Sequence, residues 1–396
     1  MGGTARRSPC PATGAGLHCA TPIYPQPPAI TTLSTAPAPH SSTPAPRVWL
    51  LEPYRAGEQQ QALALAEALG EPFVRKRLRY YRLRGAATNL GRGSGLAGID
   101  RRRSDALVPP WPELLITAGM RNEPVARWIR ERSAGRTRLV HIGRPWADPE
   151  DFALVITTPQ YRLPQRSNVL HNDLPLHRVH ADRLAAAAER WAPVLGHLPA
   201  PRIAVIAGGN SGPYTLGVRA ARRLLADAEA LARAAGGSLL ITTSPRTPAV
   251  ARRVLETDCG VPAHCYVWRA GDPDNPYFGY LALADALVVT ADSISMLAEA
   301  GATGKPLYLF DLGDGRHRMR PGAGEGRDDP RLGALCYRAL MRWGWQRLSR
   351  DITLVHRRLI ASGRAVWLGE AMPARPGAVR EIDMQRALAR VRALLA

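Results

Sequence analysis

A glycine-rich stretch is the first candidate for binding chemistry. Gly208, Gly209, Asn210, Ser211 and Gly212 follow the apolar run 203–207 and precede a helical pattern. Glycines let backbone amides approach an anion closely, and the N-terminus of a following helix adds a favourable dipole. The stretch lacks the Gly-Lys-Ser/Thr of a P-loop and the spacing of a dinucleotide fingerprint. It predicts a phosphate-binding loop, with a tight strand-to-helix turn as the alternative.

A second polar loop follows the next predicted strand. Thr243, Ser244 and Arg246 stand where a dinucleotide site would need an acidic residue, which argues against NAD. Hydroxyls and a guanidinium suit phosphate oxygens instead. Because strand ends on one edge of a parallel sheet share a crevice, we expect these residues near the glycine loop. The alternative is a surface arginine in a proline-bounded loop.

A third loop opens a helix after the predicted strand 287–290. The backbone amides near Ser293, Ser295 and Met296 are placed to hold phosphate, and Glu299 to accept hydrogen bonds from ribose hydroxyls. The alternative is structural: a serine caps the helix, and an acid near its start favours the dipole.

Catalytic and metal-ligating residues are harder to find. A transferase needs a general base, and His141, at the end of a predicted strand, is the only candidate; a core histidine is the alternative. Cys259, His264 and Cys265 have no standard zinc spacing, so we expect no metal. Five cysteines, an odd number, argue against a disulfide framework and for a reducing compartment.

These loops need elements to position them, and the chain offers two series of short apolar strands and amphipathic helices. Alternation of this kind predicts parallel sheets with helices on both faces. The first series has strands at 48–51, 73–74, 114–118, 139–142 and 154–157, with helices at 58–69 and 124–133. The second has strands at 203–207, 238–242, 263–267, 287–290 and 307–310, with helices at 218–235, 249–257, 277–284 and 295–303.

Further helices are expected at 181–195, 331–343, 353–361 and 382–395, and 196–201 reads as a linker. We therefore predict α/β architecture with two facing Rossmann-like, doubly wound domains. The predicted divisions are a disordered Pro-, Thr-, Ser- and Ala-rich tail at 1–46, domains at 47–197 and 198–372, and a C-terminal helix at 373–396.

Charge points to an anionic partner. The net charge is +20, and all but two of the 53 basic residues are arginines, a bias that a GC-rich genome also produces. No nucleic-acid-binding motif accompanies the charge, so we expect no nucleic-acid partner. Between Pro72 and Asp105 lie ten basic and two acidic residues, which predicts contact with anionic lipid head groups or phosphorylated substrates. The alternative is a solvated loop.

The motifs resemble the mitochondrial-fission Elm-type family. The resemblance covers most of residues 48–310 and rests on the segments 157–161, 208–212, 242–248, 275–282, 292–299 and 304–306. That family in turn resembles GT-B glycosyltransferases of the MurG-like kind. By this resemblance Glu299 binds ribose, residues 293–296 bind diphosphate, and residues 208–211 line the cleft. Gly57 and Gln60 then mark the acceptor side.

The resemblance implies three functions. The first is sugar transfer from a nucleotide-diphosphate sugar to an acceptor, in cell-envelope synthesis at the membrane surface, with no cofactor. The second is epimerisation of a nucleotide sugar on the same fold. The third is a non-catalytic adaptor at a membrane surface. No apolar stretch is long enough to span a bilayer. We expect the protein in the cytoplasm or peripherally at the inner face of the membrane.

Overall fold

A computed structural model describes residues 47–81, 93–257, 259–322, 324–344, 349–372 and 382–396. The tail predicted to be disordered, 1–46, lies outside the described residues. No helix within the described ranges is long and apolar enough to cross a membrane.

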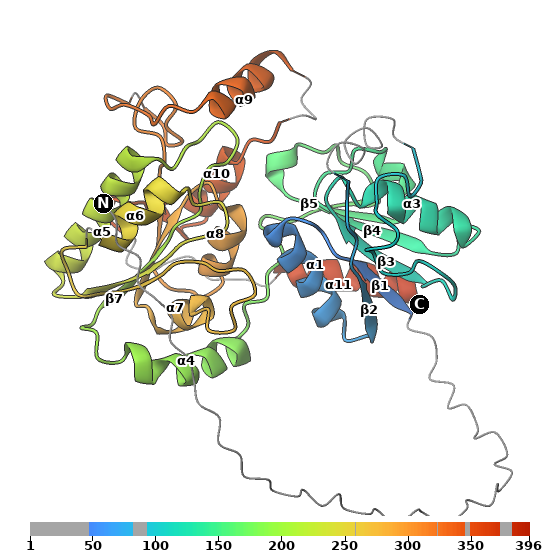
Figure 1. The fold of residues 1–396 in the computed structure, drawn as a ribbon, viewed down its shortest axis with the longest axis horizontal. Coiled ribbons are helices and arrows are strands. Elements are labelled where there is room, and N and C mark those ends of the chain that lie inside the picture. Colours follow the sequence, from blue (N-terminus) through green and yellow to red (C-terminus); the bar gives the residue numbers. More distant parts are fainter. Residues whose placement is uncertain (1–46, 82–92, 258, 323, 345–348, 373–381) are drawn as a thin grey trace, which may run out of the picture. The chain divides into compact units, whose positions relative to one another are not determined.

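The first sheet has six parallel strands in the order β2-β1-β3-β4-β5-β6 (Figure 1). Helix α1, Ala56–Leu69, covers one face and α3, Glu123–Arg132, the other, so β1, β3 and β5 are buried along their whole length, whereas the edge strand β2 is partly exposed and ends in Arg75 and Lys76. The strands are β1 Val48–Leu51, β2 Phe73–Lys76, β3 Leu114–Ala118, β4 Arg138–Ile142, β5 Leu154–Thr157 and β6 Val169–His171. Short 3-10 turns at Pro149–Asp151 and Pro159–Tyr161 flank β5.

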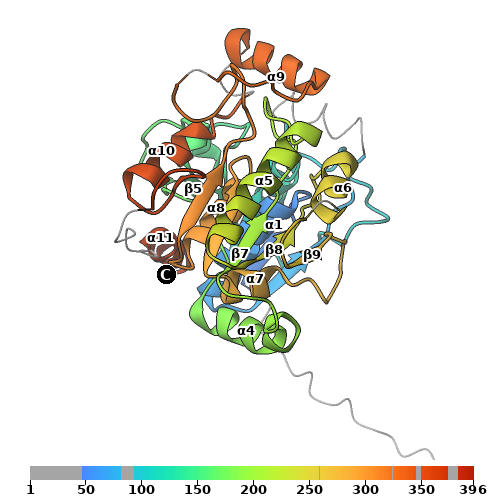
Figure 2. The same cartoon turned by 90° about the vertical axis from the view of Figure 1, so that its left-hand side faces the viewer.

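The second sheet also has six parallel strands, in the order β12-β11-β10-β7-β8-β9. Figure 2 labels β7, β8 and β9 of this sheet. Its strands are β7 Arg202–Ile206, β8 Ser238–Thr242, β9 Ala263–Tyr266, β10 Ala286–Thr290, β11 Leu307–Phe310 and β12 Val366–Trp367. The helices of this half are α4 Ala181–Leu195, α5 Val218–Ala234, α6 Ala249–Thr257, α7 Tyr277–Leu283, α8 Ile294–Gly301, α9 Leu332–Trp343 and α10 Thr353–Ala361.

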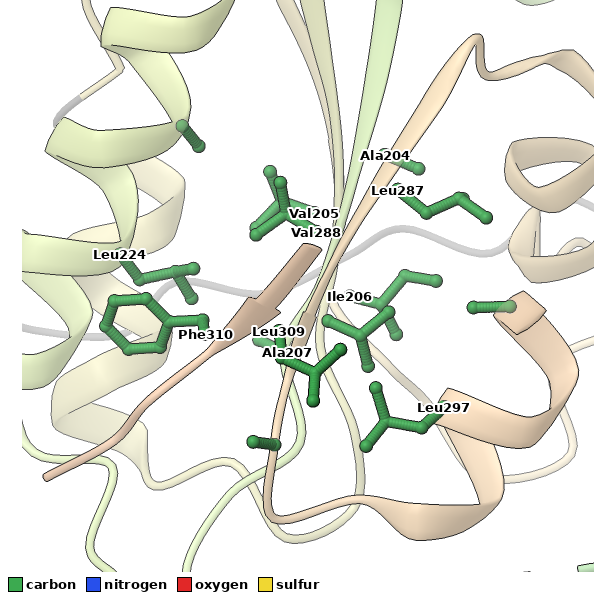
Figure 3. Packing of buried hydrophobic residues seen from close by; sticks show 14 of the residues in the cluster. Ala204, Val205, Ile206, Ala207, Leu224, Leu287, Val288, Leu297, Leu309 and Phe310 are labelled. Carbon is green, nitrogen blue, oxygen red and sulfur yellow. The ribbon is translucent and has the colours of Figure 1, made fainter. Parts of the chain in front are cut away.

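The core of the second sheet has two sides because side chains alternate along each strand. In Figure 3, Val205 and Val288 point toward Leu224 of α5, whereas Ile206 points toward Leu297 of α8. All five of these side chains are fully buried, and Leu224 and its neighbours fill the space beneath α5. This packing fixes β7 and β10 side by side, and with them the loops that follow.

The two separate sheets confirm the predicted α/β fold with two Rossmann-like, doubly wound domains, the pairing that defines the GT-B class. Strands β6 and β12 were not predicted, because runs of three and two residues are too short to show a pattern. Helix α11, Ile382–Leu395, packs Ala387 and Val391 beside α1, so this helix contributes to the core of the first sheet. The predicted domain boundaries stay predictions.

Candidate functional site

The polar loops that the sequence singled out follow three neighbouring strands of the second sheet. β7 lies between β10 and β8, and the connections run in opposite directions from β7. Ligands of doubly wound sheets bind at such a switch point, outside the carboxyl ends of the strands. The structure therefore brings residues 208–211, 243–246 and 291–296 to one edge.

A buried carboxylate, Asp292, lies at the centre of this edge. The Gly209 amide donates a hydrogen bond of 3.1 Å to its Oδ2, and the Thr290 hydroxyl donates one of 2.7 Å to its Oδ1. The same hydroxyl accepts from the Gly208 amide at 2.7 Å. Arg246 adds an ion pair of 2.8 Å with Oδ2, and the Asp292 side chain is 0% exposed. The strand ends are thus joined by one charged network.

The two glycines are required by this network. A Cβ at Gly208 would lie 2.5 Å from Oδ1 of Asp292, and a Cβ at Gly209 would lie 2.1 Å from the carbonyl oxygen of Arg246. The Gly209 amide, expected to face a phosphate, therefore faces the internal Asp292 carboxylate, and the Gly208 amide donates to the Thr290 hydroxyl. The sequence does not reveal this role of Asp292, because a carboxylate that binds its own glycine loop has the same sequence signature as one that caps a helix.

The loop after β8 is closed by its own hydroxyls. The Thr243 Oγ1 accepts from the Trp268 amide at 3.0 Å, and the Ser244 hydroxyl donates to the carbonyl oxygen of Gly208. The Ser244 amide donates to the Thr247 Oγ1 at 2.9 Å. Thr243 and Ser244 are both buried. Ser244 links the loops after β7 and β8, and Thr243 links the loop after β8 to the segment after β9, which the sequence did not show.

Asn210 and Ser211 complete the loop after β7. The Asn210 side chain accepts from the Leu216 amide at 3.0 Å, and its carbonyl accepts from Arg246 at 3.3 Å. Arg350 donates to the Ser211 hydroxyl at 2.9 Å. Arg350, from the segment before α10, is a site residue that the sequence did not reveal. Together with Arg246 it places two guanidinium groups at this edge.

Helix α8 begins here without a capping side chain. Ser293 occupies the N-cap position, but neither it nor another described side chain accepts a capping hydrogen bond. Ser295 and Met296, in the first turn, are partly exposed. The structural alternative of a serine cap therefore does not hold for Ser293. Uncapped first-turn amides carry partial positive charge and are the preferred partners of anions.

Glu299 lies one turn further along α8 and is buried. Its Oε2 accepts a hydrogen bond from the Tyr277 hydroxyl. Burial raises the pKa of Glu299 to about 7, although the Tyr277 hydrogen bond and the Arg183 and Arg178 charges act in the opposite direction. The carboxyl predicted to meet ribose is thus held by a tyrosine, and its pKa lies close to physiological pH.

The start of α1 meets the start of α8. A Cβ on Gly57 would lie 3.0 Å from the Ser295 hydroxyl oxygen, so any larger residue would press that hydroxyl to move by a few tenths of an ångström. Gln60, the other residue predicted on the acceptor side, accepts from Arg178 at 3.3 Å. Gly57 therefore touches the candidate phosphate site, whereas Gln60 is engaged in a structural contact.

Glu58, beside Gly57, is a candidate that the sequence analysis missed. Its Oε1 lies 3.4 Å from Arg55, while its buried Oε2 has no hydrogen-bond partner among the described residues. Burial raises its pKa against the opposing charges of Arg55 and Arg350. Gly119, after β3, leaves room for this carboxylate, since a Cβ there would lie 2.4 Å from Oε2. The sequence signal that could have pointed to Glu58 is an acidic residue in the first turn of the helix that follows the first strand.

His141 lies inside the core of the first sheet. It is 0% exposed, its ring lies tilted against Phe152 with the ring centroids 5.1 Å apart, and neither ring nitrogen has a hydrogen-bond partner within the described residues. Its Nε2 is 3.9 Å from Glu123, and burial lowers its pKa to about 3. A fully buried histidine with so low a pKa is a weak base, which favours the alternative of a core histidine.

The cysteine and histidine residues of β9 and the preceding loop have structural contacts. The Cys259 thiol lies 3.4 Å from the Val261 carbonyl, and His264 is hydrogen-bonded to the Tyr280 hydroxyl at 2.5 Å. In the part of the chain that the structure describes, no group of three His, Cys, Asp or Glu residues could hold a metal ion.

The basic segment between Pro72 and Asp105 is only partly described, because residues 82–92 lie outside the described ranges. Arg75 forms an ion pair with Glu52, and Lys76 lies over the Trp49 ring at 4.3 Å. Part of this charge is therefore already matched within the first sheet.

Comparison with known proteins identifies relatives. The family described as Mitochondrial fission ELM1 matches residues 56–325. The "Mitochondrial fission protein ELM1" of Arabidopsis thaliana is 31% identical over 220 residues, which cover 50% of this chain and 51% of that protein. The chain thus spans about half the length of that relative. The "Uncharacterized protein RP120" of Rickettsia prowazekii (strain Madrid E) is 24% identical over 297 residues, covering 66% and 82%.

Among solved structures, that of the E. coli ADP-heptose lps heptosyltransferase II aligns with a TM-score of 0.39 and 12% identity. The alignment covers 88% of this chain and 98% of the other. A likeness of this size says nothing about the chemistry of this chain.

Proposed function

The chain belongs to the mitochondrial fission ELM1 family, and we propose that it binds a nucleoside-diphosphate sugar at the carboxyl edge of its second sheet and transfers the sugar to an acceptor. The observation that carries this proposal is the uncapped start of α8 at the switch point, with Gly57 of α1 against it. An anion is the ligand that such a helix end prefers.

The diphosphate would take the amides of Ser295 and Met296 and the Ser295 hydroxyl. Arg350 and Arg246 supply the positive charge that a bound metal supplies in other diphosphate sites. Glu299 would accept from a ribose hydroxyl through the carboxyl oxygen that Tyr277 does not bind. The proposal thus keeps Glu299 away from the phosphates, where like charges would repel.

Sugar transfer requires a base and a stabilised leaving group. Glu58 would take the proton of the acceptor hydroxyl while the acceptor oxygen bonds to the anomeric carbon and the bond from that carbon to the diphosphate oxygen breaks. The negative charge that develops on the diphosphate would lie against the start of α8 and Arg350. Burial raises the pKa of Glu58, which makes its carboxylate a stronger base.

Binding and turnover test this proposal separately. Calorimetry with UDP, ADP and GDP sugars, pyrophosphate and free sugar should show binding only of ligands that carry a diphosphate. Ser295→Glu places a carboxylate in the phosphate position and should abolish binding, whereas Ser362→Glu, at an exposed helix end, is the matched control. Glu58→Gln should retain binding and lose release of nucleoside diphosphate.

Each result has a defined meaning. Binding that survives Ser295→Glu contradicts the site. Binding without release of nucleoside diphosphate from the wild type, over a panel of lipid and sugar acceptors, retains the site and refutes the transfer. Failure of all nucleotides to bind favours the adaptor role that the family resemblance also implies.

A further inference from the structure

Helix α9 presents an apolar stripe to solvent. Leu332 and Trp343 are each 77% exposed and Leu335 is 58% exposed. With Cys336 and Ala339 they occupy positions i, i+3, i+4, i+7 and i+11, which form one face of a helix. Of the ten large hydrophobic side chains that are exposed among the described residues, four lie in this helix. In an ordinary surface helix such a stripe faces the core.

The stripe is not needed to hold α9 in place. Tyr337, on another face, packs beneath the loop after β7, where a Cβ on Gly212 would lie 3.1 Å from its ring. Arg331 anchors the start of the helix by donating to the carbonyl oxygens of Gly212 and Tyr214 at 2.6 and 3.1 Å. Figures 1 and 2 both show α9 at the margin of the fold, away from the second sheet. The described part of the chain therefore leaves this apolar face exposed to a partner.

The charge around the stripe indicates the kind of partner. Residues 331–350 contain five arginines, two tryptophans and no acidic residue. Arg342 is exposed and lies 5.5 Å from the Trp343 ring. Helices that lie in the head-group region of anionic membranes have this composition, with leucine and tryptophan beside arginine and no acidic residue.

We propose that α9 is an interfacial helix that inserts Leu332, Leu335 and Trp343 into an anionic lipid surface while Arg338 and Arg342 meet the lipid phosphates. This assigns membrane contact to α9 rather than to the basic segment between residues 72 and 105, where Arg75 and Lys76 already have partners. The proposal is independent of the nucleotide site.

Vesicle co-sedimentation tests the assignment. Wild-type protein should bind vesicles of phosphatidylcholine with 30% phosphatidylglycerol and bind pure phosphatidylcholine far more weakly, with the difference reduced at high salt. Leu332→Ser/Leu335→Ser/Trp343→Ser should lower binding to the anionic vesicles by about tenfold or more. The matched control, Val108→Ser/Val194→Ser/Val250→Ser, alters three other exposed side chains and should bind like the wild type.

Three outcomes would overturn the proposal: no binding of the wild type to anionic vesicles, equal binding by the α9 variant with an unchanged melting temperature, or loss of binding in Arg101→Gln/Arg102→Gln/Arg103→Gln alone. Sedimentation velocity tests the alternative that a second copy of the chain covers the stripe. A wild-type dimer that the α9 variant converts to monomers would show that a second copy of the chain, and not lipid, covers the stripe.

Discussion

Asp292→Asn separates the two roles that the structure gives to the network around Asp292. The substitution preserves shape but removes the buried charge that Arg246, the Gly209 amide and the Thr290 hydroxyl all contact. A hydrogen bond to a charged group contributes about 1.5–3 kcal/mol. Because the Arg246 side chain is 39% exposed and can be rehydrated, its share is small. We expect a loss of about 2 kcal/mol in the free energy of unfolding.

The same substitution should strengthen anion binding. It removes a negative charge near the start of α8 and releases Arg246, so pyrophosphate and nucleoside diphosphate should bind about tenfold more tightly, a gain of about 1.4 kcal/mol. Scanning calorimetry should show a melting temperature lower by about 3–6 °C, and titration calorimetry should show the tighter binding. These two effects have opposite signs.

The control is Asp274→Asn, an exposed carboxylate paired with Arg190, which should change neither quantity measurably. An unchanged melting temperature for Asp292→Asn would refute the network. A lower melting temperature together with weaker pyrophosphate binding would show that Asp292 shapes the loop for the anion and does not compete with it.

Three further substitutions test individual side chains. Burial raises the pKa of Glu299 from 4.5 to about 7, so between these two pH values the folded state keeps a proton that the unfolded state loses. The stability of the wild type therefore falls as the pH rises through this range. The melting temperature of Glu299→Gln should rise relative to that of the wild type between pH 5 and 8. A constant difference would contradict the shift. Burial lowers the pKa of His141 from 6.5 to about 3, so the wild type loses stability as the pH falls below 6.5. The melting temperature of His141→Leu should rise relative to that of the wild type on acidification, and its turnover should be unchanged. Loss of turnover in this variant would instead support His141 as the general base. Gly57→Ala should displace the Ser295 hydroxyl and weaken nucleotide binding several-fold, while Gly93→Ala, with open space around its Cβ, should not. Equal nucleotide affinities of Gly57→Ala and the wild type would show that α1 is not part of the binding site.

Much of the fold was accessible from the sequence because buried parallel strands are apolar along their length. The runs 114–118 and 238–242 match β3 and β8 exactly. The same reasoning placed the polar loops at one edge of the sheet. Strand β12 was missed because its two residues gain their role only by pairing with β11. The place of α11 on the first sheet is likewise a long-range contact that no local pattern specifies.

The chemistry of the site was less accessible, because it depends on which groups satisfy one another. The sequence suggested that glycine amides and Arg246 would bind a phosphate, but the structure pairs the Gly209 amide and Arg246 with Asp292 and the Gly208 amide with the Thr290 hydroxyl. It offered His141 as the base, yet a histidine in a buried strand and one at a strand end look alike in sequence. Glu58 was overlooked because its unpartnered oxygen is visible only once Gly119 lies beside it.

Hydrogen exchange of the backbone amides, measured with and without a saturating nucleoside diphosphate, tests the central claim most directly. The account predicts that the ligand slows exchange in the peptide spanning residues 293–297, the first turn of α8, and that Ser295→Glu abolishes this protection. Protection confined to other strand ends, or no change in exchange anywhere with any nucleoside diphosphate, would contradict a diphosphate site at the start of α8.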